Sequence, residues 1–290
     1  MFKGAIVAIV TPFKNGKVDE DALRELIEFQ IVNGTDGIVP CGTTGESATL
    51  SHEEHDRVIE ITINAVKKRV PVIAGTGSNS TAEALRLTAH AHKAGADGAL
   101  VVCPYYNRPT PEGLYQHFKT IAENVPIPII PYNIPSRTGV NLMPDMVARL
   151  SKIKNIVGIK EASGSIKQMS DIIDLCSEDF AVLSGDDIFT LPLLAIGGAG
   201  IISVISNVVP ADMAGLVDAF TSGDMTKAKA LHHKMAALIE ALFIEVNPVP
   251  VKAALALMGK IMYEYRLPLC KMAEANFEKL KKVMVSYALI

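Results

Sequence analysis

The sequence predicts an α/β protein, a (β/α)8 TIM barrel followed by a C-terminal helical region. Short apolar runs rich in β-branched residues recur at intervals of roughly 25–35 residues, each followed by a polar turn and a helical pattern. The runs are apolar throughout rather than alternating, which is typical of strands buried on both faces. A doubly wound open sheet is the alternative, but eight units in about 220 residues suit a closed barrel better. The expected strands cover residues 5–10, 37–41, 70–75, 98–103, 127–132, 156–160, 181–185 and 201–205.

The segments between these runs carry signals for helix starts. Acidic residues at 19–21 open one helix, and S-H-E-E at 51–54 and S-T-A-E at 80–83 both have the pattern of a capping box. Strand signals stop after residues 221–224. We therefore expect a barrel domain over residues 1–224 and a three-helix region over residues 225–290, with breaks at N-P-V-P (247–250) and R-L-P (266–268).

Composition limits the classes of function. The 290 residues include 28 Lys and Arg against 31 Asp and Glu, a formal charge of −3, which argues against a nucleic-acid partner. With 49% hydrophobic and 20% charged residues, the chain can bury a large core. Four cysteines stand far apart without C-x-x-C spacing, so we expect reduced thiols and a cytoplasmic protein. The N-terminal apolar run reaches Thr-Pro without a cleavage motif and predicts a first strand, not a signal peptide.

One uncharged stretch, residues 188–211, is long enough to span a bilayer. Pro192, the glycine-rich turn at 197–200 and the polar residues Ser203, Ser206 and Asn207 divide it. It therefore predicts a short helix, a turn and a buried strand, and no membrane segment.

Polar residues that follow the strands of a barrel meet at one face, where its active site lies. The second expected strand leads into G-T-T-G-E at 42–46, in which backbone N–H groups and the hydroxyls of Thr43 and Thr44 can hold a carboxylate. The alternative is an ordinary turn. The sixth strand ends at Lys160, whose amine, made less basic by burial, could form a Schiff base with a ketone. The alternative is an ion pair with Glu161 or Glu46.

The fourth and fifth strands add further candidates at the same face. Tyr132 could relay protons and Arg137 could bind a carboxylate, while Tyr105 and Tyr106 supply two more phenols or merely pack as a lid. Together with Lys160, these residues describe a site for a small 2-oxo acid that needs no metal or cofactor.

Three other motifs are weak. H-E-E-H at 52–55 lacks the spacing of a zinc protease site, G-G-A-G at 197–200 precedes a strand instead of a helix, and G-T-G at 75–77 lacks the third glycine of a dinucleotide fingerprint.

Four motifs resemble the dihydrodipicolinate synthase (4-hydroxy-tetrahydrodipicolinate synthase) family: G-T-T-G-E at 42–46, P-Y-Y-N at 104–107, Y-N-I-P-S-R-T-G at 132–139 and G-I-K-E at 158–161. The resemblance runs the length of the chain and includes N-P-V-P-V-K at 247–252. The wider superfamily contains N-acetylneuraminate lyases and 2-keto-3-deoxy sugar acid aldolases. Arg137 distinguishes the synthase family from the sugar-acid aldolases, which generally have other residues at this position.

The resemblance implies a function and roles. It implies condensation of pyruvate with L-aspartate 4-semialdehyde in lysine and diaminopimelate biosynthesis, with Lys160 forming the imine and Arg137 binding the semialdehyde carboxylate. Tyr132, Thr44 and Tyr106 would form a proton relay, with Tyr106 reaching into a neighbouring subunit of a homotetramer built as a dimer of dimers. Backbone positions Gly185 and Ile202 would line the pocket. A pyruvate-releasing sugar-acid aldolase and a non-catalytic 2-oxo acid sensor remain alternatives.

Family members inhibited by L-lysine bind it at a dimer interface, and the resemblance therefore implies L-lysine as a feedback inhibitor here. His55 carries most of this expectation, because members insensitive to lysine commonly lack a histidine or glutamate there. The implied effector residues are Ser47, Ala48, His52, His55, Asn79, Glu83 and Tyr105.

Overall fold

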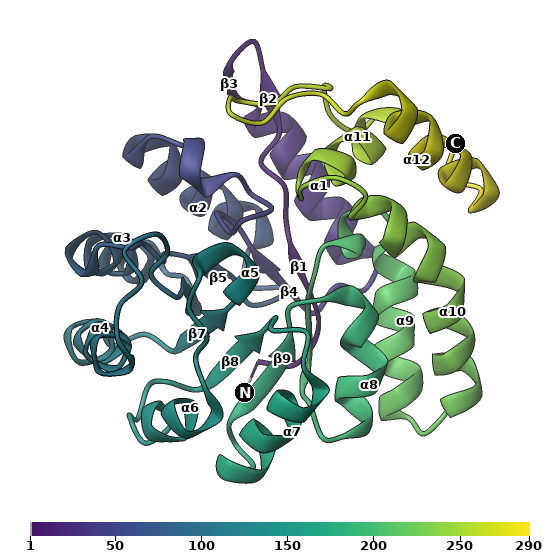
Figure 1. Ribbon diagram of the computed structural model, residues 1–290. Coiled ribbons are helices and arrows are strands. Elements are labelled where there is room, and N and C mark those ends of the chain that lie inside the picture. The colour runs from purple at the N-terminus through teal and green to yellow at the C-terminus, as the bar shows by residue number, and fades with distance from the viewer. Residues whose placement is uncertain (1) are drawn as a thin grey trace.

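The computed structural model describes residues 2–290, and over this range eight parallel strands form a barrel surrounded by helices (Figure 1). The strands pair in the order β4-β1-β10-β9-β8-β7-β6-β5. Each expected strand is present within a few residues of its expected bounds. The barrel strands are β1 (Gly4–Ala8), β4 (Gly37–Val39), β5 (Ile73–Gly75), β6 (Gly98–Val102), β7 (Ile129–Asn133), β8 (Gly158–Glu161), β9 (Ala181–Ser184) and β10 (Gly200–Ser203).

The barrel closes between β4 and β5. An isolated parallel bridge joins Ile38 to Val72, and the N–H of Ile38 donates to the carbonyl of Pro71 at 3.0 Å. The N–H of Gly75 donates to the carbonyl of Pro40 at 2.9 Å. These bonds satisfy backbone groups that a doubly wound sheet would leave at its edges. The barrel prediction is therefore confirmed and the open-sheet alternative is wrong.

Helices cover the outside of the barrel. They are α1 (Glu20–Val32), α2 (His52–Val66), α3 (Thr81–Ala94), α4 (Pro111–Asn124), α5 (Pro135–Thr138), α6 (Pro144–Leu150), α7 (Ile166–Leu175), α8 (Thr190–Ala195) and α9 (Pro210–Thr221), with short 3-10 turns η1 (Ser47–Thr49), η2 (Asp187–Phe189) and η3 (Ile205–Asn207).

The two expected capping boxes have different outcomes. At α2 the Ser51 hydroxyl accepts from the N–H of Glu54, and the Glu54 carboxylate accepts from the N–H of Ser51, so this box is confirmed. At α3 the Ser80 hydroxyl accepts from the N–H of Glu83, but the Glu83 carboxylate binds Ser78 and His52 instead of returning to the cap. The second box is therefore only half formed.

A small antiparallel hairpin, β2 (Phe13–Lys14) and β3 (Lys17–Val18), was not predicted because each strand has two residues. The backbone N–H groups of Asn15 and Gly16 donate to the carboxylate of Glu264, at 2.9 and 2.5 Å. The hairpin thus lies beside the C-terminal part of the chain, as Figure 1 shows.

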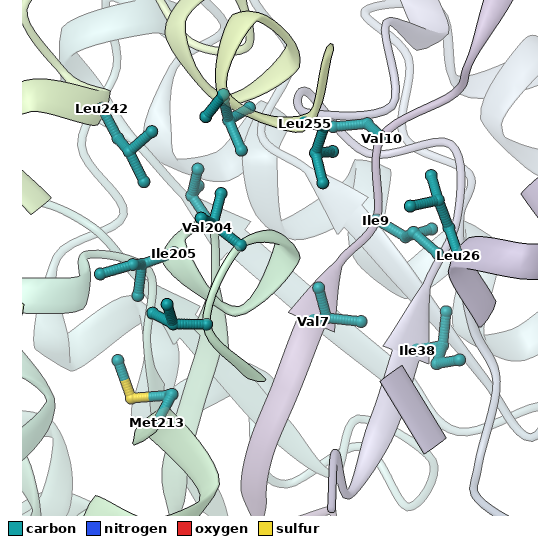
Figure 2. Packing of buried hydrophobic residues seen from close by; sticks show 14 of the residues in the cluster. Val7, Ile9, Val10, Leu26, Ile38, Val204, Ile205, Met213, Leu242 and Leu255 are labelled. Carbon is teal, nitrogen blue, oxygen red and sulfur yellow. The ribbon is translucent and has the colours of Figure 1, made fainter. Parts of the chain in front are cut away.

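Over residues 225–290 the chain forms α10 (Met225–Leu242), α11 (Val249–Leu257) and α12 (Glu274–Ser286). These helices share one hydrophobic cluster with the barrel: Leu242 and Leu255 belong to the same buried cluster as Val7, Ile9 and Val204 (Figure 2). Burial of this shared apolar surface fixes the C-terminal segments against the strands.

Residues 188–211 contain the predicted short helix, turn and buried strand, which are α8, the glycine-rich segment 197–200 and β10. The 3-10 turns η2 and η3 beside them were not predicted. In the part of the chain from residue 2 to residue 290, no helix combines the length and apolarity that crossing a membrane requires.

Candidate active site

Strand β8 places Lys160 at the carboxyl end of the barrel. Gly158–Glu161 is buried along its whole length, and Lys160 pairs in register with Tyr132 on β7 and Leu183 on β9. The side chain is 5% exposed, and its Nζ lies 4.2 Å from the centroid of the Tyr132 ring. Burial removes this amine from water, the medium that stabilises its charged form best.

The structure provides neither of the acidic partners weighed for Lys160. The Glu161 carboxylate accepts from the Asn133 side chain at 2.9 Å and from the N–H of Ser163 at 2.6 Å. Glu46 pairs with Lys252 at 2.5 Å. Among the described residues, Lys160 forms no ion pair, so the interpretation of Lys160 as a structural salt-bridge residue is wrong.

Burial lowers the pKa of Lys160 from 10.5 to about 7. The negative charge of Asp187 opposes this change, and the positive charge of Arg137 adds to it. A large fraction of the amine is therefore neutral near pH 7, which is the form that attacks a carbonyl.

Asp187, at the start of η2, was missed by sequence reasoning. Its carboxylate accepts from the Ser203 hydroxyl at 2.7 Å and from the N–H groups of Val204 and Ile205 at 3.2 and 3.1 Å. Burial raises the pKa of this carboxyl to about 6, against the effect of these hydrogen bonds. The available signal was its position two residues after the seventh expected strand, where polar residues face the site.

The loop that follows β4 enters the site through a strained backbone. Cys41 and Glu46 both have left-handed φ values, 56° and 52°. A side chain at Gly75 would clash with the carbonyl of Cys41, so only glycine allows β5 to approach the loop. This packing leaves Thr44 only 2% exposed, while Thr43 lines a cavity.

Tyr132 lies inside the barrel with Ile202, in the same buried cluster. Burial raises the pKa of Tyr132 to about 12, while Arg137 and a hydrogen bond with the Thr43 hydroxyl lower it. The phenol therefore keeps its proton at neutral pH and can hand it on through a hydroxyl partner. Gly185 leaves room next to Lys160, since a Cβ there would lie 3.1 Å from the lysine Cε.

The C-terminal region holds the loop from outside the barrel. Asn247 Nδ2 donates to the Thr44 hydroxyl at 3.0 Å, and the Asn247 carbonyl accepts from Arg137 Nη2 at 3.0 Å. Lys252 on α11 forms an ion pair with Glu46, in which both side chains are 0% exposed. Sequence reasoning assigned no role to Asn247 or Lys252, although the motif at 247–252 contains both.

A cavity of about 610 Å³ opens over this region. Thr43, Arg137 and Asn247 line one part of it, and His52 and Glu83 line another. Four more of the predicted site residues also line it: Ser47, Ala48, His55 and Tyr105. Within residues 2–290, the predicted site residues that lie outside this lining are Lys160, Tyr132, Thr44, Tyr106, Gly185, Ile202 and Asn79.

Tyr106 differs from the other candidates because it is 91% exposed. Its φ is 71°, a left-handed conformation that is rare for an aromatic residue. Arg108 nearby also has a positive φ, 44°, and Asn107 Nδ2 donates to the carbonyl of Asn79 at 2.8 Å. The strand-to-helix connection thus holds a large apolar ring out in solvent at a backbone cost.

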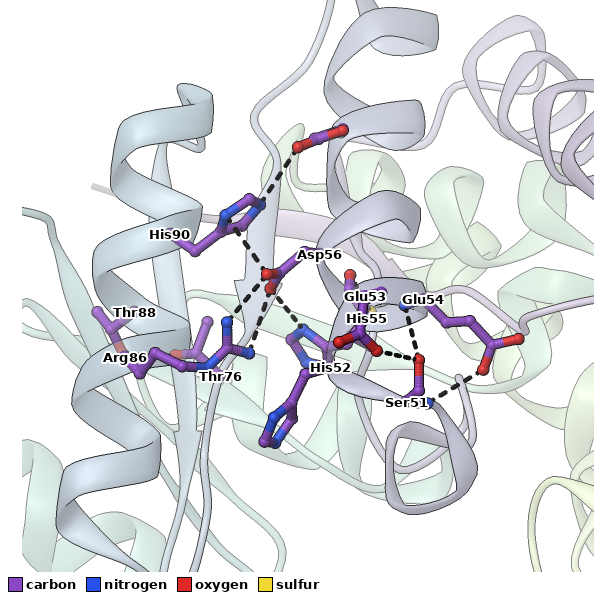
Figure 3. Close-up of polar contacts among 12 residues, drawn as sticks. Ser51, His52, Glu53, Glu54, His55, Asp56, Thr76, Arg86, Thr88 and His90 are labelled. Carbon is purple, nitrogen blue, oxygen red and sulfur yellow. Dashed lines mark hydrogen bonds and ion pairs between the residues drawn. The ribbon is translucent and has the colours of Figure 1, made fainter.

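Polar contacts connect α2 and α3 beside the cavity (Figure 3). His52 Nε2 lies 2.8 Å from the carboxylate of Glu83. His55 is 5% exposed, and its Nδ1 lies 3.9 Å from Asp56, which in turn binds Arg86 at 2.9 Å. Burial lowers the pKa of His55 to about 4. The cluster therefore presents an acidic side chain and two imidazoles, of which His55 is neutral at pH 7, to the cavity.

Comparisons with known proteins agree with this geometry. A family model described as the dihydrodipicolinate synthetase family matches residues 1–286. A protein of Syntrophus aciditrophicus named 4-hydroxy-tetrahydrodipicolinate synthase is 77% identical over 290 residues, 100% of both chains. The crystal structure of dihydrodipicolinate synthase from Aquifex aeolicus has a TM-score of 0.98 and 52% identity over 99% of each chain. A lysine-bound structure of the Cyanidioschyzon merolae protein has a TM-score of 0.97 and 41% identity, covering 100% of this chain and 99% of that chain.

Proposed function

The chain belongs to the dihydrodipicolinate synthetase family, and we propose that Lys160 is the residue through which it acts. The protein is an enzyme that condenses pyruvate with L-aspartate 4-semialdehyde to 4-hydroxy-tetrahydrodipicolinate in lysine and diaminopimelate biosynthesis. The observation that carries the role of Lys160 is its buried amine, with a pKa of about 7, at the carboxyl end of β8.

The chemistry follows from this amine. Its neutral form attacks the ketone of pyruvate, and loss of water gives an imine. Loss of a methyl proton converts the imine to an enamine, whose carbon forms a bond to the aldehyde of the semialdehyde. The amino group of the second substrate then replaces Lys160 at the imine carbon, which closes the ring and frees the lysine.

Each proton transfer needs a partner, and the ring of Tyr132 lies 4.2 Å from the Nζ of Lys160. We assign Tyr132 and Thr44 to the relay, with Thr43 and the backbone of the 42–46 loop on the pyruvate carboxylate. Arg137 binds the semialdehyde carboxylate, because its guanidinium offers paired donors at the cavity wall. Gly185 and Ile202 complete the walls around the lysine.

Tyr106 completes the relay from a second subunit. Its 91% exposure and left-handed backbone suit a side chain that packs only in an assembly. We propose a homotetramer built as a dimer of dimers. Mixing Tyr106→Phe with Lys160→Ala subunits should restore some activity in hybrid dimers, and no recovery after proven subunit exchange would refute the shared site.

L-lysine is the proposed feedback inhibitor. Glu83 can pair with its α-amino group, and the His52 and His55 rings with Ser47, Ala48, Asn79 and Tyr105 supply the remaining contacts. The relative from Cyanidioschyzon merolae is described with lysine bound. Calorimetry should show binding at millimolar lysine and partial loss of activity, and full activity without binding would refute this proposal. With four free thiols in residues 2–290, we place the enzyme in the cytoplasm.

The decisive experiment is reduction with borohydride in the presence of pyruvate, followed by mass mapping. Modification of Lys160 is expected, and an unmodified Lys160 would rule out the imine. Assays with the semialdehyde and with sugar acids then separate a synthase from a sugar-acid aldolase. Arg137→Ala should slow turnover of the semialdehyde far more than formation of the pyruvate imine, whereas a 2-oxo acid sensor would show no turnover.

A further inference from the structure

Asn247 stands between the two substrate sites that the proposed function assigns. It lies in the connection between α10 and α11 and is 7% exposed. Its backbone carbonyl accepts from Arg137, and its side-chain amide donates to Thr44, each at 3.0 Å. One residue of the C-terminal region therefore touches both the carboxylate-binding arginine and the relay threonine.

The direction of the second bond fixes a proton. A threonine hydroxyl has one O–H to donate and two lone pairs to accept with. Because the Asn247 amide nitrogen is the donor, the hydroxyl of Thr44 acts as the acceptor here. Its own proton stays free for another partner. In the proposed relay that partner is the bound substrate or Tyr132, whose described hydroxyl contact is with Thr43.

The other end of the amide supports a role beyond packing. Asn247 Oδ1 is buried and has no hydrogen-bond partner among residues 2–290. An unpaired buried oxygen is unfavourable, so a side chain that served packing alone would be better apolar. Among the described residues, the side chain of Asn247 therefore makes its one hydrogen bond through its nitrogen, to Thr44.

The support around this bond is stiff. Two residues after Thr44, Glu46 forms its buried ion pair with Lys252, and Lys252 also lies 4.2 Å from the ring centroid of Phe13. The 42–46 loop is thus held from the C-terminal region at two points, which fixes the backbone position from which the Thr44 hydroxyl meets Asn247.

We propose that Asn247 is a positioning residue that sets the donor direction of the Thr44 hydroxyl and so keeps the relay proton available for catalysis. This inference rests on the proposed function, in which Thr44 belongs to the relay.

The test uses Asn247→Asp, which has the same shape. A carboxylate only accepts, so it would capture the Thr44 proton, whereas the protonated carboxyl can donate as the amide does. We expect kcat of this variant, taken relative to the wild type at the same pH, to be about 10²-fold lower above pH 6. It should recover as the pH falls toward about 4, the ordinary pKa of an aspartate, and this recovery is the limb that the inference predicts. Asn247→Ala should lower kcat without this limb. The control variant Asn124→Asp makes the same change at an exposed residue, the last of α4, and should have the kcat profile of the wild type.

A charge near Arg137 could also repel substrate, so the double variant Thr44→Val/Asn247→Asp is the control. If Asn247 acts through Thr44, the extra limb in kcat is absent from the double variant. A limb that persists there, or an Asn247→Asp profile parallel to the wild type from pH 4 to 8, overturns the inference. Borohydride trapping of pyruvate on wild-type Lys160 separates the two levels: no trapping overturns the proposed function and this inference with it, and trapping with parallel profiles overturns this inference alone.

Discussion

The pKa of Lys160 gives a prediction that pH alone can test. With a pKa of about 7, the amine is roughly three-quarters neutral at pH 7.5, whereas a lysine at its ordinary 10.5 is neutral to about 0.1%. The difference in reactive amine is several hundred-fold. From pH 6 to pH 8 the neutral fraction rises about tenfold and then levels off.

The assay is the initial rate of pyruvate trapping at low pyruvate, with cyanoborohydride as the reductant and mass spectrometry of the Lys160 peptide as the readout. The rate should follow a single titration with a midpoint near pH 7. A rate that is still rising steeply at pH 9, with a midpoint near 10, would show that burial does not lower the basicity of this amine.

Charge variants move the same midpoint in opposite directions. Asp187→Asn removes a negative charge that raises the pKa of Lys160, so the midpoint should move to lower pH. Arg137→Ala removes a positive charge that lowers this pKa, so the midpoint should move to higher pH. Shifts in the same direction for both variants would contradict an electrostatic origin.

Three further predictions follow from contacts elsewhere. Lys252→Met leaves the Glu46 carboxylate buried without its partner and should cost about 3–5 kcal/mol of unfolding free energy in urea, most of it recovered in the Glu46→Gln/Lys252→Met double variant. Gly185→Ala places a methyl group 2.7 Å from Ala162 Cβ and 3.1 Å from Lys160 Cε, which displaces the lysine stem, and should lower kcat/KM for pyruvate about tenfold. Burial lowers the pKa of His117 to about 4, so between pH 6.5 and 4 the unfolded chain binds a proton more readily than the folded one. The free energy of unfolding should therefore decrease as the pH is lowered from 6.5 to 4. In urea titrations, His117→Gln should make this decrease smaller.

The Lys252→Met prediction has a matched control variant, and each of the other two has a result that would contradict it. Lys167→Met breaks an exposed pair with Asp171, 83% and 39% exposed, and should change stability by about 0.5 kcal/mol or less. If Lys252→Met costs no more than this, the buried pair is not a stabilising contact. Wild-type turnover in Gly185→Ala would contradict the crowding argument, and equal acid slopes in the wild type and His117→Gln would show that His117 does not contribute to acid sensitivity.

The barrel was predictable because its signals are local. A strand buried on both faces needs an unbroken apolar run, and this requirement appears directly in residues 98–103 and 127–132. The polar residue that ends such a run lies at the carboxyl end of the barrel, so the sequence alone predicts Lys160 and Tyr132 at one face.

The contacts that hold the site could not be read from the sequence because their partners are far apart along the chain. Asn247 and Thr44 are 203 residues apart, and Lys252 and Glu46 are 206 apart. The half-formed box at Ser80 failed for a related reason. Its local pattern is correct, but His52, which is 31 residues from Glu83, binds the carboxylate that the cap would use.

The position of the 41–55 segment links catalysis to the proposed inhibitor site. Its first part carries Thr44, held by Asn247, and its last part, across η1, carries His52 and His55 on the wall of the same cavity. The intervening residue Glu46 is fixed by Lys252, so the two parts share one anchored backbone. A ligand that binds His52 and His55 would therefore act on the same short segment whose Thr44 hydroxyl we propose to serve the relay. Coupling through this segment requires no movement of the barrel strands, and it should weaken when Lys252 no longer holds Glu46.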